Sequence, residues 1–205
     1  TRERTLEIAS LLKNTYGMET AHHLTCVGSS KSTITAILEL LRKHNIENIV
    51  ALRGDSPQDE KEFIPALDGY NHGNQLVSHI QSFGGFGIGV AGYPEKHLEA
   101  LDFATDLQNL KRKVESGADF FLAQAFYQIE EANQFKAAYR QLTGHDFPRP
   151  IFYGVPILRE DGITFGNIPT KVRRDLEQGR SGIDIALEQL QNFIQNDMTT
   201  IYLVP

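Results

Sequence analysis

The chain has 205 residues, of which 40% are hydrophobic and 22% are charged, as is ordinary for a folded globular protein. This composition excludes a disordered chain and a collagen, and Cys26, the single cysteine, excludes a disulfide scaffold. The net charge of −6 argues against a nucleic-acid partner, which would need a basic face. The length predicts a single domain over residues 1–205. Without an export leader or an apolar run of about 20 residues, we expect a cytoplasmic protein with no membrane partner.

Helix-like and strand-like segments alternate through the first half of the chain. Ser30 is suited to cap the second helix, because a serine side chain can accept from the first free backbone N–H groups. The expected elements are a helix at 2–16, a strand at 22–27, a helix through 34–41, a strand at 48–52, a helix through 76–83 and a strand at 86–91.

The second half continues the alternation. Pro169 fits the first turn of a short helix, where its missing N–H costs nothing. The expected elements are a helix through 103–114, a strand at 120–126, a helix through 135–142, a strand at 150–158, the short helix after Pro169, a long helix marked by Ile183, Leu187, Leu190 and Ile194, and a strand at 199–204.

Six strands separated by helices, with no hairpin signal, predict parallel strands with helical crossovers. Two architectures are compatible with that pattern, an open doubly wound sheet and a (β/α)8 barrel. A barrel needs eight strands and typically about 250 residues, so the length fits an open sheet better. Spacing and composition do not decide between them.

Polar residues gather where the expected strands end, which is where parallel α/β proteins bind their ligands. They suit hydrogen bonding to a polar heterocycle and include no convincing nucleophile–base pair. These residues are Thr25, Cys26, Arg53, Gly54, Asp55, Tyr93, Glu95, His97 and Gln124.

Three other patterns are weak functional signals. Residues 87–92 match G-x-G-x-x-G but lie inside an expected strand, which favours close backbone packing over a dinucleotide-binding turn. His22 and His23 are adjacent in a strand and point to opposite faces, so we predict no metal site there. Nothing near Cys26 in the sequence would lower its pKa, which argues against a nucleophilic thiol.

Asp106, Asn109, Arg112 and Lys113 are spaced to share one flank of a helix. Spacing alone favours a solvated charged face. The functional interpretation is a clamp on a phosphate-bearing ligand, with Arg112 and Lys113 for phosphate and Asp106 for ribose hydroxyls.

Five blocks in order resemble the methylenetetrahydrofolate reductase family, over about residues 1–158. The tail, residues 168–205, fits more loosely. The blocks are 23–26 (HLTC), 49–55 (IVALRGD), 90–97 (VAGYPEKH) with Glu99 and Ala100, 106–114 (DLQNLKRKV), and 117–119 (GAD) leading to Gln124.

The resemblance implies a (β/α)8 barrel that binds FAD and uses NADH or NADPH to reduce 5,10-methylenetetrahydrofolate to 5-methyltetrahydrofolate. It assigns Asp55 and Gln124 to the pterin of the folate, with Asp55 as the catalytic residue that orients the pterin and tunes the flavin. It assigns these residues to FAD: His23, Thr25, Arg53, Gly54, Ala91, Tyr93, His97, Ala100, Asp106, Asn109, Arg112 and Lys113.

The sequence also departs from the family pattern. The family's first strands, including a glutamate that is the proposed proton donor, would precede Thr1, and residues 159–167 are shorter than in the family. We therefore expect an incomplete barrel with about six of eight βα units. Two alternatives stay open, an inactive or truncated flavin- or folate-binding barrel and an open-sheet protein with a non-flavin nucleotide. A homo-oligomer also stays open.

Overall fold

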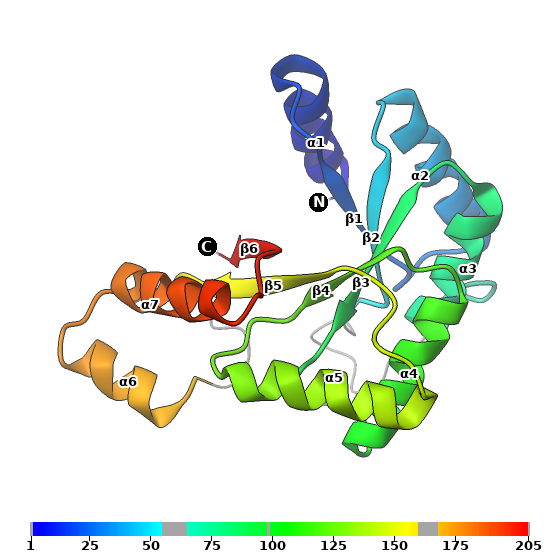
Figure 1. Cartoon of the computed structure of the whole chain (residues 1–205). Coiled ribbons are helices and arrows are strands. Elements are labelled where there is room, and N and C mark those ends of the chain that lie inside the picture. Colours follow the sequence, from blue (N-terminus) through cyan, green and yellow to red (C-terminus); the bar gives the residue numbers. More distant parts are fainter. Residues whose placement is uncertain (1, 55–64, 98, 160–167, 205) are drawn as a thin grey trace. The chain divides into compact units, whose positions relative to one another are not determined.

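A computed structural model describes residues 2–54, 65–97, 99–159 and 168–204. Figure 1 shows the helices and strands of this part of the chain, which alternate as predicted. The strands are β1 (Ala21–Thr25), β2 (Asn48–Leu52), β3 (Gly87–Gly92), β4 (Phe120–Ala123), β5 (Ile151–Pro156) and β6 (Ile201–Val204). The helices are α1 (Arg2–Tyr16), α2 (Lys31–Lys43), α3 (Gly73–Phe83), α4 (Phe103–Glu115), α5 (Ile129–Thr143), α6 (Thr170–Glu177) and α7 (Gly182–Gln195).

The strand order follows the chain order from β1 to β6. β1 pairs with β2, β2 with β3, β4 with β5 and β5 with β6, all in parallel. The predicted α/β fold with helical crossovers is therefore confirmed, whereas an eight-unit barrel stays a prediction. Contacts divide the chain into two compact units, residues 1–91 with 109–120 and residues 92–108 with 121–205.

The first unit is built on β1, β2 and β3, with α2 and α3 on one face of these strands (Figure 1). Ser30 caps α2 as predicted, because its Oγ accepts from the Thr33 N–H at 3.1 Å. The apolar stripes of α2 and α3 form the core against the strands. Its fully buried side chains include Ile34, Leu38, Leu41, Leu76, Val77 and Ile80.

The glycine-rich stretch 87–92 is β3 itself and not a turn. A Cβ built on Gly89 would lie 2.3 Å from Cε2 of Phe120, far inside van der Waals contact. Gly89 therefore lets an aromatic ring pack directly on the backbone, and close packing is confirmed as the reason for this motif.

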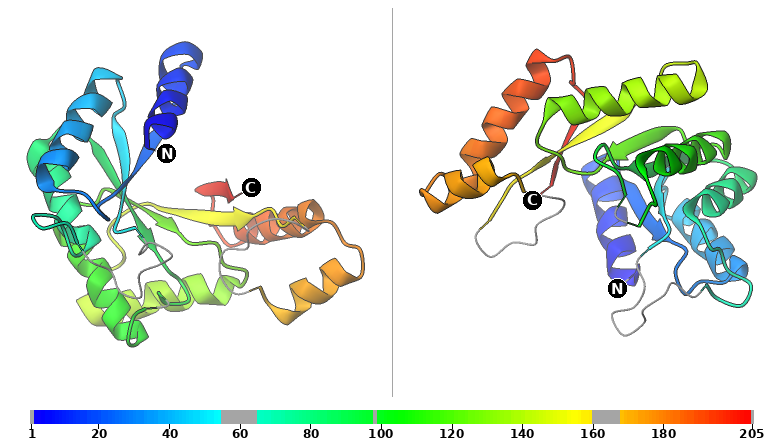
Figure 2. Two further views of the ribbon diagram at one scale, coloured as in Figure 1. Left: turned by 180° about the vertical axis from the view of Figure 1, so that it is seen from behind. Right: turned by 90° about the horizontal axis from the view of Figure 1, so that it is seen from below.

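In the second unit, α5 and α7 pack on β5 around an aromatic core (Figure 2). The rings of Phe126 and Phe193 stack with centroids 5.0 Å apart, and Tyr153 meets Phe126 edge-on at 6.1 Å. β4 ends at Ala123 and not at residue 126 as predicted, yet Phe126 is completely buried because it leaves the strand to join this core.

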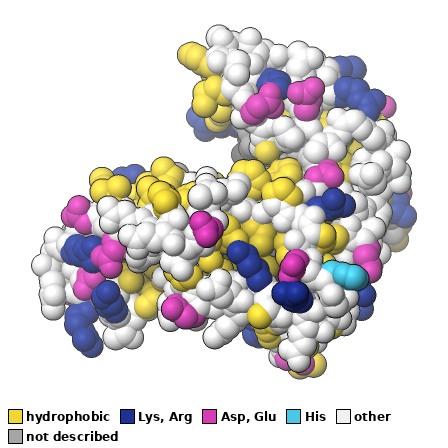
Figure 3. All heavy atoms as spheres, in the orientation of Figure 1, with side chains coloured by type: hydrophobic (Ala, Val, Ile, Leu, Met, Phe, Trp, Pro, Cys, Tyr) yellow, Lys and Arg dark blue, Asp and Glu magenta, His cyan; other side chains and the backbone are white. Residues whose placement is uncertain are grey.

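The most regular apolar pattern of α7 predicts the wrong buried face for this helix. Ile183, Leu187 and Ile194 indicate the helix correctly but are 63%, 51% and 53% exposed. The buried face of α7 consists of Ile185, Ala186, Gln189 and Phe193. Apolar residues occupy two sides of this helix, and the stacking of Phe193 on the aromatic core selects one of them. Figure 3 shows hydrophobic side chains at the surface in the region of α7.

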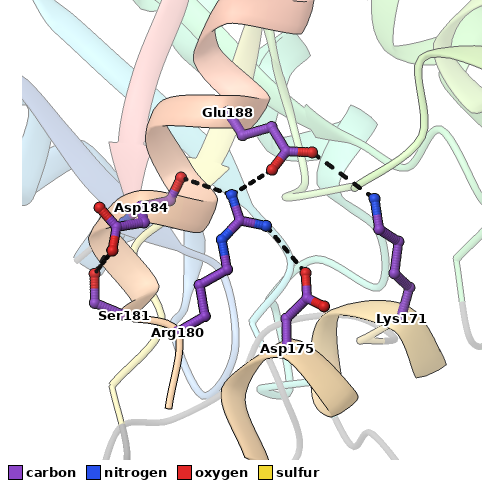
Figure 4. Close-up of polar contacts among 6 residues, drawn as sticks. All are labelled: Lys171, Asp175, Arg180, Ser181, Asp184 and Glu188. Atoms are coloured by element: carbon purple, nitrogen blue, oxygen red, sulfur yellow. Dashed lines mark hydrogen bonds and ion pairs between the residues drawn. The ribbon is translucent and has the colours of Figure 1, made fainter. Parts of the chain in front are cut away.

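Ionic contacts join α6 to α7 (Figure 4). Arg180, in the connection, pairs through Nη1 with Asp175 of α6 at 3.0 Å and through Nη2 with Glu188 of α7. Lys171 reaches the same glutamate at 3.8 Å, and Ser181 caps α7 by accepting from the Asp184 N–H. These contacts fix the short helix, which has no buried residue of its own.

Within the described ranges, no helix combines the length and apolarity that crossing a bilayer would require.

Candidate functional site

In the first unit, the candidate residues lie at the carboxyl ends of β1 and β2. His22 is 3% exposed and His23 is exposed, so the two imidazoles lie on opposite faces of β1, as predicted. Thr25, at the end of the strand, is half-buried on the same face as His23. Asp55, the predicted catalytic residue, lies outside the described residues.

Gly54 is required by its surroundings. Its φ is +85°, and a Cβ there would lie 2.6 Å from Cγ1 of Val27 and 3.1 Å from Cβ of Thr25. A side chain at this position would therefore clash with the end of β1 in a backbone conformation that already favours glycine. The Val27 N–H donates to the Arg53 carbonyl at 2.9 Å, which fixes the two strand ends side by side.

Cys26 is completely buried. Its thiol donates to the Arg53 carbonyl at 3.4 Å, and burial raises the pKa of the thiol. The neutral thiol is therefore favoured, which supports the prediction that Cys26 is not a nucleophile.

α4 carries the predicted polar cluster, here called the α4 flank (Asp106, Asn109, Arg112 and Lys113). Nη1 of the exposed Arg112 donates to Oδ1 of Asn109 at 2.9 Å. Nζ of the half-buried Lys113 donates to the Ala91 carbonyl at 2.9 Å, which ties the helix to the end of β3. Leu107 and Leu110 are buried on the other side. The flank therefore presents guanidinium and ammonium donors of the kind that bind phosphate oxygens.

In the second unit, the 93–97 segment (Tyr-Pro-Glu-Lys-His) folds against the start of α4. The rings of Tyr93 and His97 meet edge-on with centroids 4.5 Å apart. The His97 N–H donates to Oδ2 of Asp106 at 2.9 Å, a contact that sequence reasoning missed. The Ala100 N–H donates to the His97 carbonyl at 3.0 Å. Asp106 therefore holds the segment through Oδ2.

Lys96, in this segment, has a φ of +110°, which is rare for a residue with a side chain. Its Nζ donates to the Ala100 carbonyl at 2.7 Å. Backbone strain of this kind concentrates at functional sites, where the surrounding contacts maintain it.

Gln124 follows β4 and is half-buried, and its backbone N–H donates to the Gly92 carbonyl at 2.8 Å. Close by in sequence, the buried hydroxyl of Tyr127 has no hydrogen-bond partner among the described residues. Burial, and then the nearby Glu95 carboxylate, raise the pKa of Tyr127 to about 12, so this phenol is neutral at physiological pH.

A cavity of about 460 Å³ lies in the second unit, and Glu95 and Glu131 both line it. Burial and then the charge of Glu95 raise the pKa of Glu131. Sequence reasoning did not select Glu131. The spacing of Gln128 and Glu131 as a capping box for α5 was the signal that would have placed it at a helix start.

Among the described residues, no three His, Cys, Asp or Glu side chains converge as a metal site would require.

The family model for methylenetetrahydrofolate reductase matches residues 1–165, which is most of the chain. The chain belongs to the methylenetetrahydrofolate reductase family. The match includes every residue that the five sequence blocks assign to a ligand, and it confirms the family predicted from those blocks.

Curated members of the family align with long stretches of the chain. Methylenetetrahydrofolate reductase (NADH) 1 of Arabidopsis thaliana is 34% identical over 227 residues, which cover 99% of this chain and 38% of the plant protein. The 5,10-methylenetetrahydrofolate reductase of Pectobacterium carotovorum is 39% identical over 136 residues, 66% of this chain and 43% of the bacterial protein. The chain thus spans less than half the length of these reductases.

Solved structures support the fold alone. A Clostridium thermocellum protein described as binding two copies of 5-methyl-5,6,7,8-tetrahydrofolic acid matches with a TM-score of 0.58 at 12% identity, over 94% of this chain and 69% of the other. A phosphonopyruvate hydrolase matches with the same score and identity, over 99% of this chain and 59% of the other.

Proposed function

We propose that this member of the methylenetetrahydrofolate reductase family is a cytoplasmic flavoprotein. In this proposal it binds FAD and catalyses the reduction of 5,10-methylenetetrahydrofolate to 5-methyltetrahydrofolate, with NADH or NADPH as electron donor. The observation that carries the proposal is the family match over residues 1–165, because it contains all the proposed cofactor residues and both proposed substrate residues. The six strands would belong to a single (β/α)8-type domain.

The described residues fit FAD chemically. Gly54 is held as a glycine by its φ and by its contact with Val27, and its backbone can donate and accept at the end of β2. Arg112 and Lys113 offer cationic N–H donors to a diphosphate. Asp106 offers a carboxylate, a group that accepts from ribose hydroxyls.

The proposed FAD contacts are His23, Thr25, Arg53, Gly54, Ala91, Tyr93, His97, Ala100, Asp106, Asn109, Arg112 and Lys113. Bound FAD would supply hydride transfer in both directions, from the nicotinamide donor and to the folate. The residues of this chain would bind, orient and electrostatically tune the cofactor.

Asp55 and Gln124 are the proposed folate contacts. A carboxylate accepts from the amino and ring N–H groups of a pterin, and an amide can both donate and accept. Two comparisons support a folate substrate. One is the family itself, and the other is the Clostridium thermocellum protein of similar fold, which is described as binding 5-methyl-5,6,7,8-tetrahydrofolic acid. NADH is the donor to test first, because the name of the plant relative specifies it.

The alternative is a flavin- or folate-binding barrel without reductase activity. Anaerobic spectroscopy distinguishes the two. The purified chain, supplied with FAD, should show flavin absorbance that NADH or NADPH bleaches and that methylenetetrahydrofolate then restores. Flavin that binds but is neither bleached nor restored would support the alternative, and a chain that binds no flavin would overturn the proposed function.

A further inference from the structure

A buried histidine of the first unit has an unmet hydrogen bond. His22, in β1, is 3% exposed, and its Nδ1 is buried without a hydrogen-bond partner among the described residues. Burial lowers the pKa of His22, so the imidazole is neutral at neutral pH and can accept at one nitrogen and donate at the other. A buried polar group that lacks a partner costs free energy, and a ligand that supplies the partner recovers it.

The same histidine lines a cavity of about 160 Å³, here called the His22 cavity, which is bordered by α1, β1 and α2 (Figure 1). Side chains alternate along β1, so His22 and Leu24 are both buried on one face of the strand. His23 and Thr25 also border the cavity but lie on the opposite face. The helices contribute only apolar side chains to the lining: Leu6, Ile37, Leu40 and Leu41. The cavity therefore combines an apolar wall with the imidazole of His22.

The size and lining of the His22 cavity select a class of ligand. A protein cavity of about 150 Å³ with an aliphatic and aromatic lining holds one benzene molecule. The His22 cavity, at about 160 Å³, therefore has room for a single six-membered ring. Its leucine and isoleucine side chains favour an apolar ring, because burying such a ring removes apolar surface from water. The imidazole favours a ring with one hydroxyl group, because that group can donate to an imidazole nitrogen.

We propose that the His22 cavity is a binding site for a small monocyclic phenol, with the ring against the apolar side chains of α1 and α2 and the hydroxyl on the imidazole of His22. The site uses the buried face of β1, whereas the proposed FAD contacts of this strand, His23 and Thr25, lie on the other face. The proposed reduction of folate makes no use of His22. Binding of a phenol is thus a property separate from the proposed function.

Phenol and benzene are the probes, because they share the ring and differ by the hydroxyl group. His22→Leu is the matched variant, because it keeps a buried side chain of similar size and removes the hydrogen-bond partner. Moving a hydroxyl from water into an apolar cavity without a partner is costly. We therefore expect His22→Leu to bind phenol at least about tenfold more weakly than the parent, and to bind benzene at least as tightly.

A second pair of variants tests where the ligand binds. Leu6→Phe enlarges a half-buried side chain that lines the cavity, so the new ring should fill the space and abolish binding of both probes. Ile8→Phe makes the same kind of change two residues further along α1. Ile8 is 54% exposed and does not border the cavity, so this variant should bind both probes as the parent does.

Calorimetric titration at neutral pH, without FAD, gives the dissociation constants for the parent and the three variants. In parallel, NMR spectra of the histidine-labelled chain should show phenol moving the ring nitrogen signals of His22 much further than benzene does. The signals of His22 are identified by their loss in His22→Leu. No binding of phenol to the parent, or the same phenol affinity in the parent and in His22→Leu, would overturn the proposal. Phenol binding that survives in Leu6→Phe would also overturn it, because the ligand would then lie elsewhere.

Discussion

Replacing the cations of the α4 flank should weaken FAD binding in a graded way. Arg112→Ala removes an exposed guanidinium that donates to Asn109 on the same helix. Lys113→Ala removes an ammonium that also donates to the Ala91 carbonyl at 2.9 Å. The first change should therefore affect binding alone, whereas the second should also loosen the link between α4 and the end of β3.

The magnitudes follow from these contacts. A charge-assisted hydrogen bond to phosphate contributes about 1.5–3 kcal/mol, so each substitution should weaken FAD binding roughly tenfold to a hundredfold. Loss of the bond to Ala91 should cost Lys113→Ala a further ~1 kcal/mol of unfolding free energy. Arg112→Ala should change unfolding by less than about 0.5 kcal/mol, as is usual for an exposed site.

Fluorescence titration with FAD gives the dissociation constants, and urea unfolding gives the stabilities. Arg112→Lys should lie between the parent and Arg112→Ala, because it keeps the charge and loses the planar fork. Lys111→Ala is the control, since Lys111 lies off the flank and pairs with Glu115 at 3.6 Å. If Arg112→Ala binds FAD as tightly as the parent, or Lys111→Ala binds as weakly as Arg112→Ala, the flank does not hold the diphosphate.

Three further outcomes are expected. Gly89→Ala should lower the unfolding free energy by about 1–3 kcal/mol, because its Cβ would overlap the Phe120 ring, and an unchanged urea midpoint would contradict this close packing. Burial lowers the pKa of His22 in the folded protein below its ordinary value of 6.5. The stability that the neutral His22 contributes is therefore fully present above pH 6.5, and it is lost as the pH falls through the lowered pKa. The acid loss of unfolding free energy should shrink in His22→Leu, and equal losses in both proteins would show that another group is responsible. Cys26 should react with iodoacetamide only slowly until urea unfolds the chain, and rapid labelling of the native protein would show that the thiol is accessible.

Periodicity predicted most of the fold because each helix and strand carries its own pattern. The α2 stripe and the strand at 48–52 match the structure closely. The buried face of α7 was not predictable in this way, because the apolar residues on its two sides are equivalent until Phe193 meets Phe126 and Tyr153. That choice depends on residues more than 35 positions away.

In the candidate site too, the sequence predicted the local features, whereas contacts between distant residues depended on the fold. Helical spacing predicted that Asp106, Asn109, Arg112 and Lys113 share a flank, because the relation is local to one helix. The bond from the His97 N–H to Asp106 required the fold of the intervening segment. The cavity that Glu95 and Glu131 both line required two elements to meet, and no spacing rule connects positions 36 residues apart.

A titration of the purified chain with FAD and with riboflavin tests the central claim most directly. Riboflavin carries the same ring system but lacks the diphosphate and the adenosine. The account predicts that FAD binds one-to-one and that riboflavin binds at least about tenfold more weakly, because it forgoes the charge-assisted bonds of Arg112 and Lys113. Equal affinities for the two compounds, or no binding of either, would contradict the assignment of the α4 flank to a flavin dinucleotide.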